Sequence, residues 1–170
     1  KRDTIMVVDG QDILAFGRQT IPSFLPGYRM NSGTFGTMGV GLPYAIGAKA
    51  ACPDKQVVCL HGDGSFGFNA MELDTAARNK LGVITVISLN AGWTAVSKRE
   101  KAGQFLGFTR YDKTAESLGC HGEFVEKPQD IRPALDRANE AAKKGIPALV
   151  NVKVDQYAGA TMSRFTTYMT

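Results

Sequence analysis

The sequence predicts an α/β fold, a doubly wound and mainly parallel sheet with helices on both faces. Short apolar runs rich in Val and Ile alternate with longer amphipathic runs, an order that builds parallel sheets covered by helices. The apolar runs hardly alternate in polarity, which is typical of strands with both faces buried. With 170 residues, 44% of them hydrophobic, the chain can bury one substantial core.

The expected elements alternate along the chain. Strands are predicted at residues 4–8, 57–61, 83–89, 123–126 and 148–154. Helices are predicted at residues 39–51, 66–80, 112–118 and 131–144. In the last helix, Asp130 is expected to be the N-cap, and Pro133 to fall in the first turn, where proline is tolerated. Gly145 can then supply the left-handed residue that ends this helix.

Cysteine usage bounds the compartment. Cys52, Cys59 and Cys120 are odd in number and widely spaced, without a CxxC pair, and only His61 and His121 could join them as metal ligands. Neither a disulfide framework nor a zinc site is expected. The chain lacks a secretory pattern and any apolar run near the roughly 18 residues that span a bilayer. We therefore expect a cytoplasmic protein without a membrane partner. The opening runs straight into the strand-like TIMVV, so the chain is also expected to be cut from something larger.

Charge and periodicity limit the partners. The net charge of +4 is spread over 20 basic and 16 acidic residues, so no nucleic-acid partner is expected. One basic cluster, Lys98, Arg99 and Lys101, is interpreted either as a solvated loop or as a contact with an anionic substrate. Residues 1–155 are expected to form the domain, and residues 156–170 either a frayed tail or a flap over a site.

Chemistry-bearing residues follow the second predicted strand. Gly62, Asp63, Gly64 and Ser65 stand between that strand and a helix, where open parallel sheets bind ligands. Glycines allow close backbone approach, and free amides at a helix start attract phosphate oxygens. This segment therefore predicts a phosphate site.

A dinucleotide site is the first alternative, because GDGSFG also matches G-x-G-x-x-G. That fingerprint needs an acidic residue about 20 positions on, at the end of the next strand. The next predicted strand ends instead in Leu89 and Asn90. Asp63 would also repel a pyrophosphate unless a cation lay between them. We therefore interpret Asp63 as a metal ligand.

Magnesium fits this interpretation, since it takes oxygen ligands and commonly bridges protein oxygens to phosphates. Asn90 can donate such an oxygen from the end of the neighbouring strand, 27 positions after Asp63. Gly92 can offer a backbone carbonyl. The predicted metal ligands are thus Asp63, Asn90 and Gly92.

Two sequence landmarks together resemble the thiamine-diphosphate enzymes. Asp63 within GDG, followed by Asn90, is similar to the family's metal motif, and GTFGTMGVGLPYAIGAKAA is similar to its second landmark. The resemblance covers nearly the whole chain and is to the C-terminal, diphosphate-binding domain. It is strongest to the branch that holds 2-hydroxyacyl-CoA lyases, oxalyl-CoA decarboxylases and acetolactate synthases. Leu89 departs from the pattern, because many members have a second asparagine there.

The resemblance implies a set of contacts with thiamine diphosphate. Met38 would prop the cofactor in a bent shape, with core filling as the alternative, and the Gly36 carbonyl would accept a bond from its aminopyrimidine. Trp93 would wall the substrate pocket, or pack only. Asp12 departs from the acetolactate synthases, which typically carry histidine. The implied cofactor contacts are Gly10, Gln11, Asp12, Ile13, Gly36, Met38, Gly62, Gly64, Ser65 and Trp93.

The resemblance also implies what is missing. In the family, an activating glutamate comes from a separate pyrimidine-binding domain, usually of a partner subunit, and no segment here matches it. No catalytic residue is therefore expected in this chain, and the parent enzyme would be about three times longer and a homodimer or homotetramer. Arg164, Phe165 and Tyr168 could form a flap over an acyl-CoA.

The reaction implied first is that of a 2-hydroxyacyl-CoA lyase, which splits a 2-hydroxyacyl thioester into formyl-CoA and an aldehyde or ketone. The alternatives are an acetolactate synthase-like or oxalyl-CoA decarboxylase-like enzyme acting on a 2-keto acid or acyl-CoA, and a degenerate module that binds cofactor without catalysis.

Overall fold

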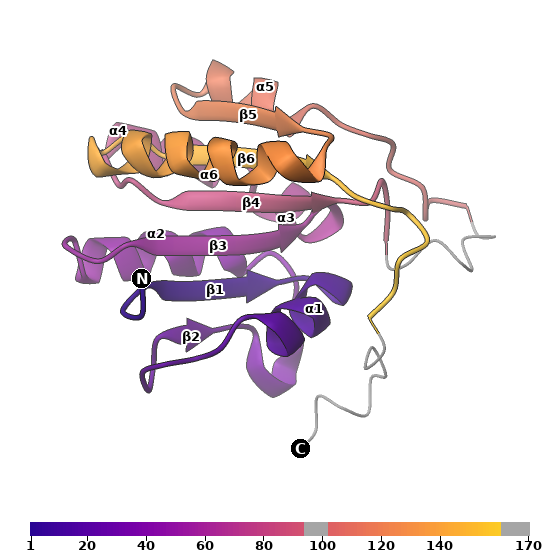
Figure 1. Cartoon of the computed structure of the whole chain (residues 1–170), viewed down its shortest axis with the longest axis horizontal. Coiled ribbons are helices and arrows are strands. Elements are labelled where there is room, and N and C mark those ends of the chain that lie inside the picture. The colour runs from indigo at the N-terminus through magenta and orange to yellow at the C-terminus, as the bar shows by residue number, and fades with distance from the viewer. Residues whose placement is uncertain (94–101, 161–170) are drawn as a thin grey trace.

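The computed structural model describes residues 1–93 and 102–160. Within them the chain forms a six-stranded sheet with helices on both faces (Figure 1). Every strand pair is parallel, in the order β2-β1-β3-β4-β6-β5. The predicted α/β, doubly wound architecture is confirmed.

Five of the strands match the predicted ones, with no end shifted by more than two residues. The strands are β1 (Ile5–Asp9), β2 (Arg29–Met30), β3 (Val57–Gly62), β4 (Ile84–Leu89), β5 (His121–Val125) and β6 (Ala148–Lys153). Strand β2 is missing from the prediction, because it is an edge strand of only two residues and contains no apolar run.

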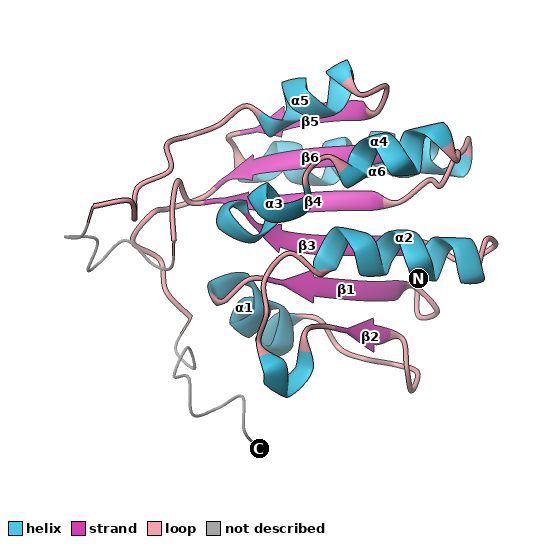
Figure 2. Cartoon of the chain, turned by 180° about the vertical axis from the view of Figure 1, so that it is seen from behind, coloured by secondary structure: helices cyan, strands magenta, loops and turns pink. Residues whose placement is uncertain are grey.

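The helices form two layers, with α2 to α5 on one face of the sheet and α1 and α6 on the other (Figures 1 and 2). They are α1 (Asp12–Thr20), α2 (Gly41–Ala51), α3 (Asp63–Asn69), α4 (Glu72–Arg78), α5 (Tyr111–Ser117) and α6 (Pro128–Lys143), with a 3-10 turn η1 (Gly33–Phe35). Helix α1 is also missing from the prediction. Its nine residues include Gly17, and it depends on the burial of Leu14 and Ala15.

The single helix predicted at residues 66–80 is wrong, because the chain forms α3 and α4 in its place. At the break, the amides of Leu73 and Asp74 bond to carbonyls only three positions back. The Asn69 side chain at the end of α3 donates to the Gly39 carbonyl (2.6 Å), so this end is bonded to another segment. Helix α3 also starts earlier than predicted, at Asp63.

The predicted start of the last helix is also wrong. Helix α6 begins at Pro128, with Lys127 as the extended N-cap, so Asp130 lies in the first turn and Pro133 inside the helix. Proline suits the first helical position because its fixed φ is helical and its missing amide would have no partner there. The predicted stop is confirmed, since Gly145 has φ +78° and its amide bonds to Ala142.

The sheet register lines up the strand ends that carry the predicted site. Asp9 of β1 pairs with His61 of β3, and Gly62 of β3 pairs with Ser88 of β4. Strands β1 and β2 are joined through α1 on one face, whereas the connection to β3 runs through α2 on the other face. A crevice forms where the strand order reverses in this way, outside the carboxyl ends of β1 and β3.

Some sequence predictions lie outside the described residues. These are the roles of Lys98, Arg99 and Lys101, and of Arg164, Phe165 and Tyr168. Across residues 1–93 and 102–160, none of the helices combines the length and the apolar character needed to cross a membrane.

Candidate functional site

A cavity of about 120 Å³ lies at the carboxyl ends of β1, β3 and β4. All the predicted site residues except Gly36 line it, together with Ser88. Its lining is Gly10, Gln11, Asp12, Ile13, Met38, Gly62, Asp63, Gly64, Ser65, Ser88, Asn90, Gly92 and Trp93. Gly36 lines an adjoining cavity of about 300 Å³, which shares Gly10, Gln11 and Met38 with the first. Segments far apart in the sequence thus meet in one place.

Asp63 joins two of these segments. Its carboxylate is buried; Oδ1 accepts a hydrogen bond from the amide of Gly64 (2.8 Å), and Oδ2 accepts one from the amide of Gly92 (2.9 Å). The start of α3 is therefore bonded to the loop that follows β4. The sequence predicted Gly92 as a carbonyl ligand, whereas the bond that the structure gives it runs through its nitrogen.

The loop after β4 turns sharply at Ala91. This residue has φ +61° and is fully buried, in a left-handed conformation that is uncommon for non-glycine residues. The Leu106 amide donates to the Ala91 carbonyl (2.9 Å), and the Trp93 amide donates to the Gln104 carbonyl (3.0 Å). These bonds hold the turn whose two flanking residues, Asn90 and Gly92, line the cavity.

The donor set at this cavity suits a hard cation. Asp63 offers a carboxylate and Asn90 an amide oxygen, the ligand types that magnesium prefers. In the part of the chain that the structure describes, no group of three or more His, Cys, Asp and Glu side chains gathers to hold a metal. The lining carries two carboxylates, those of Asp12 and Asp63, so a cation bound by Asp63 would draw most of its other ligands from neutral oxygens.

Two glycines allow the segments to close on one another. Gly10 has φ +125°, and a Cβ there would lie 3.1 Å from the Gly62 nitrogen. A Cβ at Gly64 would lie 2.7 Å from the indole ring of Trp93. A larger residue at either position would push the neighbouring segments apart, so both glycines allow the close approach that forms the cavity.

Trp93 both lines the cavity and packs, so the two interpretations of it are compatible. Its ring contacts the Gly64 backbone position and meets the ring of Phe68 edge to face, with centroids 5.8 Å apart. Met38, with 41% of its surface exposed, lies at the boundary of the two cavities. Met38 is therefore not a core residue within this chain.

Ser65 is held by a buried network. Its hydroxyl lies 2.9 Å from the Asp9 carbonyl and 3.0 Å from that of Gly62, and donates to one of them at a time. His61 Nδ1 lies 3.2 Å from the same hydroxyl. Burial lowers the pKa of His61 to about 3, so the ring is neutral and can donate from Nδ1 to the serine oxygen.

Sequence reasoning missed three residues at this site, Asp9, His61 and Ser88. Each lies at or near the carboxyl end of a strand. Burial raises the pKa of the Asp9 carboxyl, even though backbone amides donate to it. The sequence did carry a signal for Asp9, an acidic residue directly before a glycine at the end of a strand. A search for phosphate-binding glycines does not take such a residue into account.

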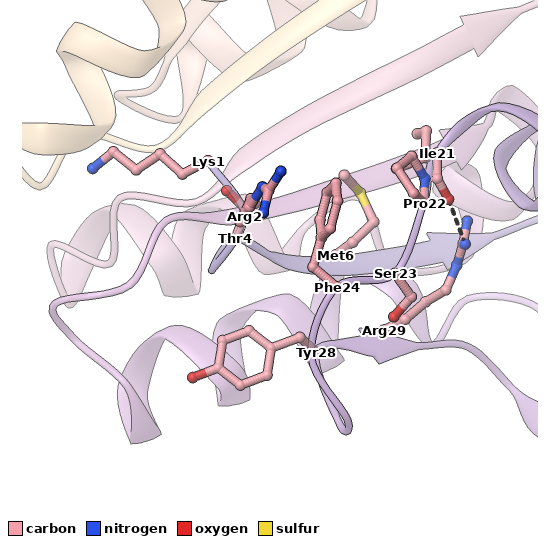
Figure 3. A pocket seen from close by; sticks show the side chains of 10 residues that line it. All are labelled: Lys1, Arg2, Thr4, Met6, Ile21, Pro22, Ser23, Phe24, Tyr28 and Arg29. Atoms are coloured by element: carbon pink, nitrogen blue, oxygen red, sulfur yellow. Dashed lines mark hydrogen bonds between the residues drawn. The ribbon is translucent and has the colours of Figure 1, made fainter.

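A third pocket, of about 70 Å³, lies beside the amino end of β1 and contains none of the predicted site residues (Figure 3). Arg2 lies over the ring of Phe24, 5.3 Å from its centroid. Arg29 donates to the carbonyls of Ile21 (2.8 Å) and Gly17 (2.5 Å). These contacts hold α1 and the following loop against the strands.

Comparisons with known proteins identify the family. The family profile "Thiamine pyrophosphate enzyme, C-terminal TPP binding domain" matches residues 14–152. A protein of Mycobacterium bovis named "Probable acetolactate synthase" is 41% identical over 91% of this chain and 29% of its own length. A "2-hydroxyacyl-CoA lyase" of Arabidopsis thaliana is 37% identical over 94% of this chain and 30% of its own.

A solved structure gives the same result. The thiamine diphosphate-dependent 4-hydroxybenzoylformate decarboxylase of Rhodococcus jostii superposes with a TM-score of 0.81 at 28% identity, over 90% of this chain and 30% of that chain. This chain therefore spans less than a third of each of these relatives. With a family profile matched over most of its length, the chain belongs to the thiamine pyrophosphate enzymes, as their C-terminal TPP-binding domain.

Proposed function

We propose that this chain is the diphosphate- and magnesium-binding part of a longer enzyme that makes or breaks a carbon–carbon bond with thiamine diphosphate. The observation that carries the proposal is the Asp63 carboxylate, buried at the cavity and bonded to the amide of Gly92, with Asn90 in the same lining. This brings the predicted metal motif together at the strand ends where open α/β sheets bind ligands.

In this proposal the residues of the cavity have distinct roles. Asp63, Asn90 and the Gly92 carbonyl hold Mg²⁺, and Gly62, Gly64 and Ser65 approach the diphosphate. The segment from Gly10 to Ile13 makes further contacts. Each of these residues lines the smaller cavity. A divalent ion between Asp63 and the phosphates would offset their mutual repulsion.

The larger adjoining cavity suits the rest of the cofactor. Gly36 and Met38 both line it. Met38 would hold the bent cofactor, and the Gly36 carbonyl would accept a hydrogen bond from the aminopyrimidine. When bound, thiamine diphosphate supplies a nucleophilic ring carbon and an electron sink, while the protein supplies geometry and electrostatics.

We further propose that the activating glutamate lies in a pyrimidine-binding domain outside this chain, in a cytoplasmic homodimer or homotetramer. The relatives support a longer parent, since the matched region is 29% of the Mycobacterium bovis protein and 30% of the Arabidopsis thaliana protein. The chain itself would supply binding residues and no acid or base.

For the reaction, we favour cleavage of a 2-hydroxyacyl-CoA between C1 and C2, giving formyl-CoA and an aldehyde or ketone. The relative named "2-hydroxyacyl-CoA lyase" supports this reaction. The second candidate is condensation of two pyruvates to acetolactate and CO₂, supported by the 41% identity to the protein named "Probable acetolactate synthase". A flavin bound to a middle domain would favour the second candidate.

The experiment uses the full-length protein. Calorimetric titration with thiamine diphosphate should give binding with Mg²⁺ and little without it. The holoenzyme is then incubated with a 2-hydroxyacyl-CoA, and the release of formyl-CoA is measured. In a separate incubation with pyruvate, the formation of acetolactate is measured. The proposal fails if uptake of the cofactor does not depend on the metal, and the favoured reaction is wrong if only pyruvate is consumed.

A further inference from the structure

We infer that Asp9 is a positioning residue, which holds the segment of Gly36 to Gly41 at the cofactor cavity. Asp9 is the last residue of β1 and is 3% exposed. A single oxygen of its carboxylate, Oδ2, accepts hydrogen bonds from the amides of Gly39 and Gly41, each at 2.8 Å. The inference rests on the proposed function only where it concerns the cofactor.

The two bonds reach across 30 and 32 positions of sequence and act where an irregular segment leads into α2. Gly39 has φ +91°, and Gly41 is the first residue of α2, whose N-cap Val40 has no side-chain cap. The first amides of a helix lack partners within the helix, and a carboxylate there is favourable. Asp9, at the end of β1, therefore caps the start of α2.

Close packing makes the position of the segment definite. A Cβ on Gly41 would lie 2.7 Å from the Cβ of Asp9 and 2.6 Å from Cε1 of His61. A Cβ on Gly39 would lie 2.8 Å from the Cβ of Phe68. At both positions the neighbouring atoms occupy the space that a Cβ would need. The segment therefore cannot shift toward β1 or α3.

What Asp9 holds is the wall shared by the two cavities. Met38 directly precedes Gly39 and lines both cavities. The backbone of Asp9 acts on the other side, because its carbonyl lies 2.9 Å from the Ser65 hydroxyl, and the chain continues into the Gly10 to Ile13 segment. One buried residue therefore contacts or precedes three of the segments around the site.

The Asp9 carboxylate is not held by a hydrogen bond to the nearby His61 ring. His61 Nδ1 lies 3.8 Å from Oδ2, beyond hydrogen-bonding distance, and instead faces the Ser65 hydroxyl. Oδ2 instead accepts hydrogen bonds from the backbone amides of Gly39 and Gly41. An uncharged acceptor of the same shape could serve them, because a carbonyl oxygen accepts two bonds. Replacing Asp9 with such an acceptor therefore distinguishes a role in hydrogen bonding from a role that needs the negative charge.

The test compares Asp9→Asn and Asp9→Ala in the full-length protein. Hydrogen exchange measured by mass spectrometry without cofactor should be about tenfold faster in peptides covering residues 36–45 of Asp9→Ala, and near the unchanged rate in Asp9→Asn. Affinity for thiamine diphosphate with Mg²⁺ should fall about tenfold in Asp9→Ala and much less in Asp9→Asn. Peptides covering β6 should exchange as before in both variants.

Asp112→Ala is the matched control, because it also removes a buried carboxylate, one that pairs with Arg110 away from the cavity. It should leave exchange at residues 36–45 and cofactor affinity unchanged. Unchanged exchange in Asp9→Ala overturns the inference, as does an Asp9→Asn variant that behaves like Asp9→Ala. If the unchanged protein fails to bind thiamine diphosphate, the proposed function fails, while the exchange result still decides the role of Asp9.

Discussion

Oδ2 of Asp63 accepts a hydrogen bond from the amide of Gly92, across 29 positions of sequence and between the ends of two adjacent strands. The bond joins the start of α3 directly to the turn after β4. The two segments that carry Asp63 and Asn90, the proposed metal ligands, are therefore linked by a bond between protein groups.

Replacing Asp63 tests that site directly. In Asp63→Ala the carboxylate ligand is lost, and we expect affinity for thiamine diphosphate with Mg²⁺ to fall by at least about 100-fold. Calorimetric titration of the full-length variant measures this. Asp74→Ala is the control, since Asp74 pairs with Arg78 on the exposed face of α4 and should not affect binding. Equal affinities in the two variants would exclude Asp63 as a ligand.

Gly64 and Gly67 form a matched pair on the same short helix. A Cβ at Gly64 would lie 2.7 Å from the Trp93 ring, whereas a Cβ at Gly67 would meet nothing within 4 Å. Gly64→Ala should push Trp93 away and weaken cofactor binding about tenfold or more. Gly67→Ala should bind normally and raise the free energy of unfolding by about 0.5–1 kcal/mol. Similar binding by both variants would contradict the close contact.

The left-handed turn at Ala91 predicts a strong dependence on side-chain shape. A β-branched residue tolerates this conformation poorly, and the site has no spare room because Ala91 is fully buried. Ala91→Val should lower the free energy of unfolding by about 2–3 kcal/mol, whereas Ala91→Gly should change it by less than about 1 kcal/mol. Urea unfolding without cofactor gives both values. A valine variant as stable as the glycine variant would show that the turn is not constrained.

Glu123 on β5 predicts a pH dependence of stability. Arg137 on α6 donates to both of its carboxylate oxygens (2.6 and 2.8 Å), and these bonds lower the pKa of Glu123 below its ordinary 4.5. The stabilisation is therefore present above that pH and is lost as the pH falls through the lower folded value. Arg137→Gln should melt at a lower temperature at pH 7, and the difference should shrink below pH 4.5.

Thermal unfolding over a pH series measures this difference. Arg132→Gln is the control, because Arg132 pairs with Asp136 on the exposed face of the same helix. It should change the melting temperature little at any pH. A difference between Arg137→Gln and the unchanged protein that stays constant from pH 7 to acid would contradict the assignment.

The sequence predicted much of the candidate site because parallel strands bring their carboxyl ends to one edge. Asp63 and Asn90 each follow a clear apolar strand, so their proximity follows from topology alone. Gly36 and Met38 came from resemblance to a family and not from strand positions. Their place beside the cavity depends on how the irregular segment before α2 folds back over β1.

What the sequence did not predict depends on contacts between distant segments. Asp9 matters because its carboxylate meets amides 30 and 32 positions away, and no local pattern encodes that meeting. The break between α3 and α4 likewise involves a bond from Asn69 to Gly39. The start of α6 was predicted wrongly for another reason. The sequence offers two acceptable starts, and the helix begins at Pro128 rather than after an N-cap at Asp130.

The fixed register of the parallel ladder has a consequence for how this domain can vary. Most residues that line the cavity lie at or just beyond the carboxyl ends of β1, β3 and β4, and the ladder sets the spacing of those ends. The turns at the opposite edge, such as residues 52–56 and 79–83, enter strands and touch none of that lining. Insertions there can lengthen the chain or build new surfaces for neighbouring domains while the ligand-binding edge keeps its geometry.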